Sequence, residues 1–244
     1  MVTTVRRGPE NYWWPSCVSE RVSIHPATMS RALKRIGARR GRPKPVVACP
    51  WSKRAKNKRL RSIEQTIAQI GDDQVVVYAD EVDIHLNPKI GLDWMNRGQQ
   101  KEVLTPGKNE KRYLAGALDV HSHELICVEG SQKNSMLFIE LLHELRHRYP
   151  DAKTIHIILD NYRIHKSDIT NAVIDYLGGK IALHFLPPYC PDENKIERCW
   201  LDLHAEVTRN HRCRSMKELM RQVRRFIRNR NSRHAASTTK RKAA

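Results

Sequence analysis

Three carboxylates that lie far apart in the chain have the residue type and local setting needed for metal chemistry. Asp80 follows the apolar run VVVYA, Asp160 follows IHIIL, and Glu197 lies within a helix expected from Pro191 onward. If the two strands lie side by side, both aspartates reach one edge of a sheet, where open sheets tend to bind ligands. An aspartate after a strand is commonly just the cap of the next loop, so the inference depends on the pair.

The helix that carries Glu197 strengthens this interpretation. Its apolar stripe is formed by Ile196, Trp200, Leu203 and Val207. Asp192 is expected to cap the helix and to need no other role. Glu197 then lies at the margin of the core, where an unpaired carboxylate is costly and one bound to a cation is not. We therefore expect Asp80, Asp160 and Glu197 to converge on metal.

The kind of ligand predicts the kind of ion. Oxygen ligands without a histidine or thiolate partner suit hard divalent cations, so the expected cofactor is Mg²⁺ or Mn²⁺. Two such ions roughly 4 Å apart can activate an attacking oxygen and stabilise the leaving oxygen in phosphodiester displacement. The carboxylates therefore predict a two-metal site that acts on nucleic acid.

A second candidate site is the segment HELRH, which matches the H-E-x-x-H pattern of zinc metalloproteases. The helix that contains it buries a stripe of leucine and aromatic residues on another side, so His143 and His147 are expected to face solvent. Pro150 ends this helix soon afterwards, and no third ligand is evident downstream. We favour an ordinary surface helix over a zinc site.

The formal net charge of +18 is distributed unevenly along the chain. Residues 1–62 carry 16 Lys and Arg against two Glu, residues 63–197 carry 14 against 21 acidic residues, and residues 198–244 carry 14 against three. Two basic arms therefore flank an acidic middle. A solvated basic face is the simpler explanation, but this balance favours nucleic acid as the partner, with binding that weakens steeply with salt.

The first basic arm contains SIHPATMSRALKRIGARRGRPKP, residues 23–45. Met29, Leu33 and Ile36 at helical spacing, ended by Gly37, predict a short helix like the second half of a helix-turn-helix. An ordinary amphipathic helix is the alternative, and the GRPKP that follows is typical of an extended basic linker. The residues expected to contact DNA are Thr28, Ser30, Arg31, Lys34, Arg39, Arg40, Arg42 and Lys44.

The sequence carries no signal for export or membrane insertion. The opening residues lack the apolar stretch of a secretory signal, and no run approaches the roughly 20 apolar residues of a membrane helix. The six cysteines are scattered without a C-x-x-C pair, which argues against a zinc knuckle or a disulfide framework and predicts reduced thiols. We expect an intracellular protein with no membrane partner.

Hydrophobic periodicity predicts the elements that must position these residues. Strands are expected at 74–81, 92–100, 112–120, 124–130, 154–161 and 180–187, and helices at 52–70, 135–148, 166–177 and from 191. Hairpin-type strands followed by alternating helix and strand predict an α/β fold, a mixed central sheet with helices on its faces. The expected domains are a partial helix-turn-helix region with linker at 1–45, a basic connecting helix at 46–73, a catalytic domain at 74–230 and a disordered basic tail at 231–244.

Three segments resemble a known family. YADE at 78–81, LDNYRIH at 159–165 and LPPYCPDENKIERCW at 186–200 are similar, in this order, to the three catalytic blocks of mariner-like DDE transposases of bacterial insertion sequences. The likeness runs over about residues 20–210. It implies a ribonuclease H-like fold, in agreement with the order of strands and helices expected above.

The resemblance also implies an activity and a set of site residues. Carried over by position, Asp80, Asp160 and Glu197 are the metal-binding triad, and Asn161 and His165 orient Asp160 or a scissile phosphate. A loop Asn and a helix-start His are the alternative for the last two. The implied protein is a DNA transposase that uses two Mg²⁺ (or Mn²⁺) ions on terminal inverted repeats and target DNA, acts as a homodimer, and is cytoplasmic and nucleoid-associated in a bacterium.

The chain also departs from this family. Relatives are expected to carry Leu and Pro where this chain has Glu193 and Lys195, which puts a new cation near Glu197. They usually have two helix-turn-helix units, and only the latter part of one is recognisable here. Two alternatives therefore stay open: a truncated, catalytically silent DNA-binding derivative that represses the full-length enzyme, and a ribonuclease H-like nuclease that cleaves RNA hybrids or junctions.

Overall fold

The computed structural model describes residues 6–7, 13–14, 24–39 and 47–242, with side chains at 24–39 and 47–236. The chain separates into two compact units, Met1–Val46 and Val47–Ala244. In the first unit, strands β1 (Arg6–Arg7) and β2 (Trp13–Trp14) pair antiparallel, and α1 (Pro26–Arg35) is the helix expected in the basic arm.

Helix α1 has recognisable start and stop signals. Nδ1 of His25 accepts the backbone N–H of Ala27 at 3.3 Å, and Pro26 takes the first helical position. Gly37, with φ +78, follows the end of the helix. The described part of this unit contains no helix before α1, so the helix-turn-helix arrangement stays a prediction.

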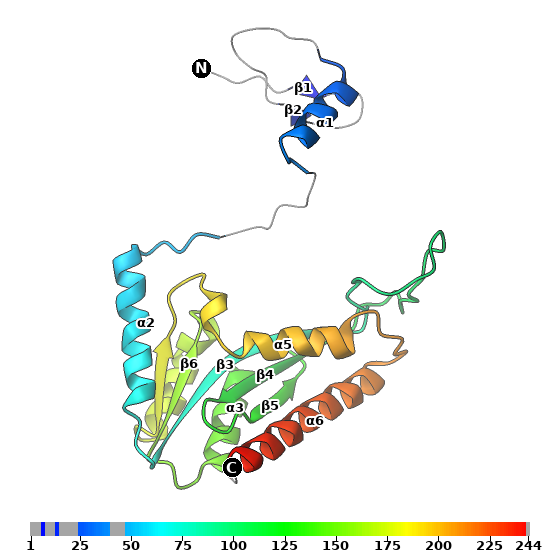
Figure 1. Ribbon diagram of the computed structural model, residues 1–244. Helices are drawn as coiled ribbons and strands as arrows, with labels where there is room; N and C mark the ends of the chain where they lie inside the picture. The colour runs from blue at the N-terminus through cyan, green and yellow to red at the C-terminus, as the bar shows by residue number, and fades with distance from the viewer. Residues whose placement is uncertain (1–5, 8–12, 15–23, 40–46, 243–244) are drawn as a thin grey trace. The chain divides into compact units, whose positions relative to one another are not determined.

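The second unit is a five-stranded mixed sheet with helices on both faces (Figure 1). The strand order is β5-β4-β3-β6-β7, with β3–β4 and β4–β5 antiparallel and β3–β6 and β6–β7 parallel. The strands are β3 (Gln74–His85), β4 (Lys111–Asp119), β5 (Leu125–Gly130), β6 (Thr154–Leu159) and β7 (Ile181–Phe185). The helices are α2 (Lys53–Ala68), α3 (Ser135–Arg148), η1 (Arg163–Lys166), α4 (Asp168–Tyr176), η2 (Pro191–Glu193), α5 (Glu197–Leu203), η3 (His204–Thr208) and α6 (Met216–Lys242).

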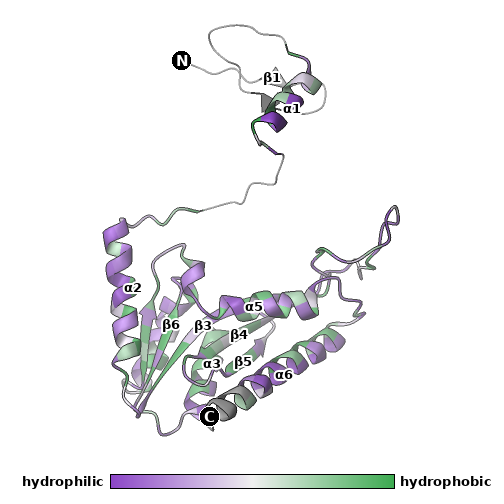
Figure 2. Cartoon of the chain, viewed as in Figure 1, coloured by the Kyte–Doolittle hydropathy of each residue, from purple (hydrophilic) through white to green (hydrophobic). Residues whose placement is uncertain are grey.

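Strand β3 is the central strand of the sheet, and both of its faces are covered. Val76 and Tyr78 pack in a core with residues of α2, α5 and α6. Val77 and Ala79 belong to a second core with α3. Successive side chains of a strand point to opposite faces, so neighbours in β3 enter different cores. Figure 2 shows hydrophobic residues concentrated on the strands and hydrophilic residues along α2 and α6.

Two strand predictions are wrong. The first strand does not end at residue 81 but continues to His85, because β4 pairs with it from Val77 to His85. The segment 92–100 is not a strand, since it has no partner strand and turns at Gly98, where φ is +80. Its apolar side chains are left in solvent, with Leu92 97% and Trp94 96% exposed.

The expectation of a disordered tail from residue 231 is also wrong, because α6 continues to Lys242. The sequence has few apolar residues from position 231 onward, but Asn231 forms hydrogen bonds to the sheet in place of apolar packing. Its Oδ1 accepts the backbone N–H of Leu125 at 2.9 Å, and its Nδ2 donates to the carbonyl of Leu125 at 2.9 Å. The start of the tail is thereby attached to the edge strand β5.

The five cysteines among the described residues are free, which agrees with the prediction of reduced thiols for these residues. Among those same residues, no helix combines the length and apolar character needed to span a bilayer.

Candidate active site

Asp80 lies inside β3, and its side chain is contacted by a residue of α5, the helix that packs against this face of the sheet. It pairs with Gly116 in the antiparallel ladder between β3 and β4. A side chain at Gly116 would collide with the ring of Trp200, so the glycine lets the indole lie against the sheet. Nε1 of Trp200 donates to Oδ2 of Asp80 at 3.1 Å. The predicted packing of Trp200 against the sheet is confirmed, with this additional contact.

Asp160 follows β6, the strand that pairs in parallel with β3. The ladder matches Tyr78 with Ile158, so Asp80 and Asp160 lie equally far beyond this pair on neighbouring strands, although β3 continues past Asp80 to His85 whereas β6 ends at Leu159. The expected proximity of the two strands is therefore confirmed. Oδ1 of Asp160 accepts the backbone N–H of Tyr162 at 2.9 Å.

Glu197 is the first residue of α5 and comes from a loop that is fastened to β3. Nδ2 of Asn194, a buried residue, donates to the carbonyl of Ala79 at 3.0 Å, next to Asp80. The prediction that Asp192 caps this helix is wrong: Asp192 lies in the short helix η2, and no side chain caps α5. The proline-rich stretch ends in a separate turn before α5 begins, which moves Asp192 away from the capping position.

The three carboxylates line one pocket of about 560 Å³. Its other walls come from the loop after β6 and from the loop that leads into α5. The residues that complete the lining are Pro50, Asn161, Tyr162, Leu186, Pro187, Pro188, Tyr189, Cys190, Pro191 and Asn194. Lys195 is not among them, and its Nζ lies over the ring of Tyr78 instead, 5.6 Å from the centroid. The prediction that Lys195 puts a new cation near Glu197 is not tested by this contact and stays a prediction.

The electrostatics of the pocket fit a cation. Burial, then the neighbouring charges of Glu197 and Glu81, raise the pKa of Asp80 to about 7. Burial and the charge of Asp160 also raise the pKa of Glu197. Carboxylates that disfavour one another's charge become favourable ligands when a hard divalent ion lies between them. The oxygen donors therefore fit Mg²⁺ or Mn²⁺.

In this conformation the three carboxylates do not all point toward one position where a metal ion could bind. In the part of the chain that the structure describes, no three His, Cys, Asp or Glu side chains are arranged to hold a metal ion. Oδ2 of Asp80 is turned to Trp200, and Oδ1 of Asp160 is turned to Tyr162 and His165. The three residues share a pocket, and joint ligation requires their carboxylates to turn toward one ion.

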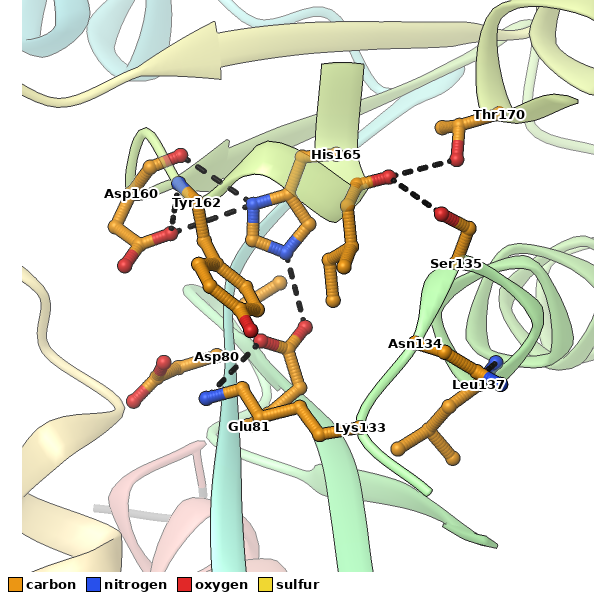
Figure 3. A network of polar contacts seen from close by, with 12 residues as sticks. Asp80, Glu81, Lys133, Asn134, Ser135, Leu137, Asp160, Tyr162, His165 and Thr170 are labelled. Carbon is orange, nitrogen blue, oxygen red and sulfur yellow. Dashed lines mark hydrogen bonds and ion pairs between the residues drawn. The ribbon is translucent and has the colours of Figure 1, made fainter. Parts of the chain in front are cut away.

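His165 forms the centre of a buried polar network behind Asp160 (Figure 3). Its Nδ1 lies 3.3 Å from Oδ1 of Asp160, and its Nε2 lies 2.9 Å from Oε1 of Glu81. Both partners are carboxylates, which accept when ionised, so both ring nitrogens carry protons. Burial opposes the charged ring, but the hydrogen bonds to Asp160 and Glu81 outweigh it and raise the pKa of His165 to about 9.

The same network holds the charge on Asp160. Burial alone would raise the pKa of this carboxyl group, but the hydrogen bonds from His165 and from the N–H of Tyr162 lower it. Asn161, the other residue expected to assist Asp160, turns elsewhere. Its Nδ2 donates to the carbonyl of Leu186, and its Oδ1 accepts from Nζ of Lys166 at 2.8 Å. Asn161 therefore joins the loop after β6 to the loop after β7.

Glu81 and Lys133 are members of this network that the sequence analysis missed. Oε2 of Glu81 lies 3.7 Å from Nζ of Lys133, in the segment before α3. The signal that could have found Glu81 is the alternation of Val82 and Ile84 with polar residues, which shows that the strand continues. A charged residue inside a strand that is covered on both faces needs a partner.

None of the remaining predicted site residues that the structure describes is among the residues that line this pocket. His143 and His147 are exposed on α3, as expected for a surface helix. Thr28, Ser30, Arg31 and Lys34 are exposed on α1, and Arg39 is exposed after it. Arg40, Arg42 and Lys44 lie outside the described residues.

Comparison with known proteins places the chain in a class. Residues 75–220 match the DDE superfamily endonuclease family, and this stretch contains Asp80, Asp160 and Glu197. The chain therefore belongs to the DDE superfamily endonucleases. A curated relative, the insertion element IS630 uncharacterized 39 kDa protein of Shigella sonnei, is 48% identical over 172 residues, which are 70% of this chain and 50% of the relative. The chain thus spans about half the length of that relative.

Solved structures agree on the fold. The Mos1 transposase paired-end complex with left transposon end has a TM-score of 0.57 at 16% identity, over 86% of this chain and 70% of that chain. The Mos1 mariner paired end complex with Mn has a TM-score of 0.57 at 15% identity, over 86% and 68%. At this identity the likeness shows the fold alone, and it confirms the ribonuclease H-like sheet that the sequence resemblance implied.

Proposed function

We propose that this chain is a DNA transposase of an insertion sequence, which cleaves and joins phosphodiesters at the ends of its element. The observation that carries the proposal is the placement of Asp80, Asp160 and Glu197 around one pocket within the DDE endonuclease stretch. Water, and then a freed 3′-hydroxyl, would attack phosphodiesters at the element ends and in target DNA. The relative from an insertion element and the Mos1 complexes with transposon ends support this choice of substrate.

The proposed chemistry assigns a role to each carboxylate and its supports. Asp80, Asp160 and Glu197 would hold two Mg²⁺ or Mn²⁺ ions, which when bound activate the attacking oxygen and stabilise the leaving oxygen. Trp200 fixes the direction of Asp80, and His165 keeps Asp160 ionised and therefore able to ligate. Mos1 structures with Mn and with Mg support the choice of ion.

The basic arms are proposed to bind the DNA. Exposed Arg31 and Lys34 of α1 would contact terminal inverted repeats together with Thr28, Ser30, Arg39, Arg40, Arg42 and Lys44. Arg221, Arg225 and Arg228 are exposed along α6 and would neutralise phosphates. Homodimer formation and association with the bacterial nucleoid in the cytoplasm are further parts of this proposal.

The test compares Asp160→Ala with wild type on labelled DNA that carries the element's inverted repeats. The variant is expected to lose Mg²⁺-dependent strand cleavage and to keep DNA binding that weakens with salt. Asp151→Ala, in the exposed turn before β6, is the matched control and should cleave like wild type. Unchanged cleavage by Asp160→Ala would remove the carboxylates from consideration.

The same assay separates the alternatives. A catalytically silent derivative would protect inverted-repeat DNA from digestion without cleaving it, even in Mn²⁺. A ribonuclease H-like nuclease would cleave RNA hybrids and leave inverted-repeat DNA intact. The retained carboxylates and their supporting contacts argue against the silent derivative, and the relative from an insertion element argues against the nuclease of RNA hybrids.

A further inference from the structure

Asp80 and Glu81 are consecutive acids with opposite surroundings. Because side chains alternate along a strand, Asp80 turns toward Trp200 of α5, whereas Glu81 turns toward the face covered by α3. The Glu81 side chain is 1% exposed and is not part of the pocket lining. Glu81 is therefore placed behind the candidate site and does not face the substrate.

Two side chains contact the carboxylate of Glu81. Oε1 lies 2.9 Å from Nε2 of His165, and Oε2 lies 3.7 Å from Nζ of Lys133 (Figure 3). Phe138 of α3 packs against the imidazole with ring centroids 4.5 Å apart. The His165 ring is thus confined by a hydrogen bond to Glu81 on one edge and by the ring of Phe138.

The orientation of the His165 ring determines which of its atoms contacts the Asp160 side chain. Nδ1 of His165 lies 3.3 Å from Oδ1 of Asp160 and 3.4 Å from its backbone carbonyl. The Asp160 side chain is 56% exposed, so few packing contacts hold it in one rotamer. Both the His165 and the Tyr162 contacts use Oδ1, which leaves Oδ2 as the oxygen of Asp160 that this network offers to a ligand.

We propose that Glu81 is a positioning residue: by holding Nε2 of His165 it points Nδ1 at Asp160 and so presets the Asp160 carboxylate for metal. This inference rests on the proposed function, because it assumes that Asp160 is a metal ligand. Outer groups that orient ligands commonly affect metal affinity by 10–100-fold. A buried carboxylate is otherwise a poor source of stability, since its desolvation offsets much of the attraction to its partners.

The experiment measures Mn²⁺ affinity by calorimetry in the absence of DNA, with the thermal midpoint of each variant recorded beside it. Glu81→Ala is expected to weaken Mn²⁺ binding by up to about 100-fold, and Glu81→Gln, which keeps an acceptor oxygen, by about 10-fold. Glu129→Ala removes an exposed acid of β5 that pairs with Arg224, and should bind Mn²⁺ like wild type. If Glu81→Ala does not fold, the Mn²⁺ affinity of Glu81→Gln is sufficient to test the inference.

A double-mutant cycle tests whether Glu81 acts through His165. Glu81→Gln combined with His165→Gln should bind Mn²⁺ no more weakly than His165→Gln alone. Without the His165 imidazole, Glu81 has no means of orienting Asp160, so its replacement should cause no further loss. Losses that multiply would overturn the inference. Wild-type affinity in Glu81→Gln, with Asp160→Ala strongly impaired, would overturn this inference and leave the proposed function standing. Unchanged affinity in Asp160→Ala would overturn both.

Discussion

Trp200 and Asp80 are joined by a hydrogen bond of 3.1 Å from the indole Nε1 to Oδ2 of the carboxylate. The indole reaches Asp80 because the residue opposite Asp80 in β4 is Gly116. Helix α5 therefore contributes twice to the pocket, once through Glu197 and once by fixing the direction of Asp80.

Removing the indole donor tests this contact. Trp200→Phe keeps an aromatic ring in the core but leaves Asp80 without its N–H partner, so we expect about 1–3 kcal/mol of lost stabilisation of the charged carboxylate. Metal-dependent cleavage should fall roughly tenfold or more, measured as the initial rate at saturating Mg²⁺. Trp51→Phe, at an exposed tryptophan, is the control. Equal rates in both variants would mean that the contact has no role in cleavage.

Gly116 can be tested by adding a single methyl group. A Cβ at this position would lie 2.5 Å from Cη2 and 2.8 Å from Cζ2 of Trp200, so Gly116→Ala must displace the indole. Overpacking of this kind costs about 1–3 kcal/mol, measured by urea unfolding, and should reduce cleavage as Trp200→Phe does. Gly71→Ala meets only the carboxylate end of Asp73, at 3.0 Å, and should be nearly neutral. A stable, fully active Gly116→Ala would contradict the packing described here.

The raised pKa of Asp80 predicts a pH-dependent stability. Burial, Glu197 and Glu81 raise this pKa from its ordinary value of 3.8 to about 7, so the folded metal-free protein binds the proton more tightly than the unfolded chain does. The resulting stability is fully present below pH 3.8 and is lost as the pH rises through about 7.

Asp80→Asn removes the charge that causes this loss. At pH 8 and without divalent ions, the variant should unfold at a higher temperature than wild type, by roughly 2–4 °C for each kcal/mol of relieved repulsion. The difference should shrink toward pH 4, and added Mn²⁺ should stabilise wild type alone. A variant that melts below wild type at pH 8 would argue against repulsion among these carboxylates.

Asn231 contributes two hydrogen bonds to the attachment of α6 to β5, beside the ion pair between Arg224 and Glu129. Asn231→Ala removes both hydrogen bonds to the backbone of Leu125 and leaves its N–H and carbonyl unpaired at the sheet edge. We expect a loss of about 1–3 kcal/mol in the free energy of unfolding. Asn229→Ala, at an exposed position two residues earlier, should change little. Equal stability of the two variants would show that the helix end does not contribute to folding.

Much of the sheet can be predicted from the sequence because apolar runs are local signals. The runs before Asp80 and Asp160 predict two neighbouring strands, and the periodicity after residue 135 predicts α3 with its observed bounds. The same reasoning assigns a strand to 92–100, where alternating residues have no strand to pair with. A strand needs a partner as well as a pattern, and the pattern alone does not supply one.

The supporting contacts of the site cannot be predicted in this way. Glu81 and His165 are 84 residues apart, and no local pattern relates one to the other. Gly116 and Trp200 likewise meet only because β4 pairs with β3 and α5 crosses the sheet. Residue types identify the candidate ligands, whereas the network that orients them depends on the folded arrangement.

The most direct test of the central claim is anomalous diffraction from crystals grown with Mn²⁺. If Asp80, Asp160 and Glu197 act together, manganese peaks should lie between their carboxylates, with two ions about 3.5–4 Å apart in the complex with DNA. Oδ2 of Asp160 should be a ligand, and Glu81 should remain on His165. Manganese bound elsewhere, or ligated by only one of the three carboxylates, would contradict the account.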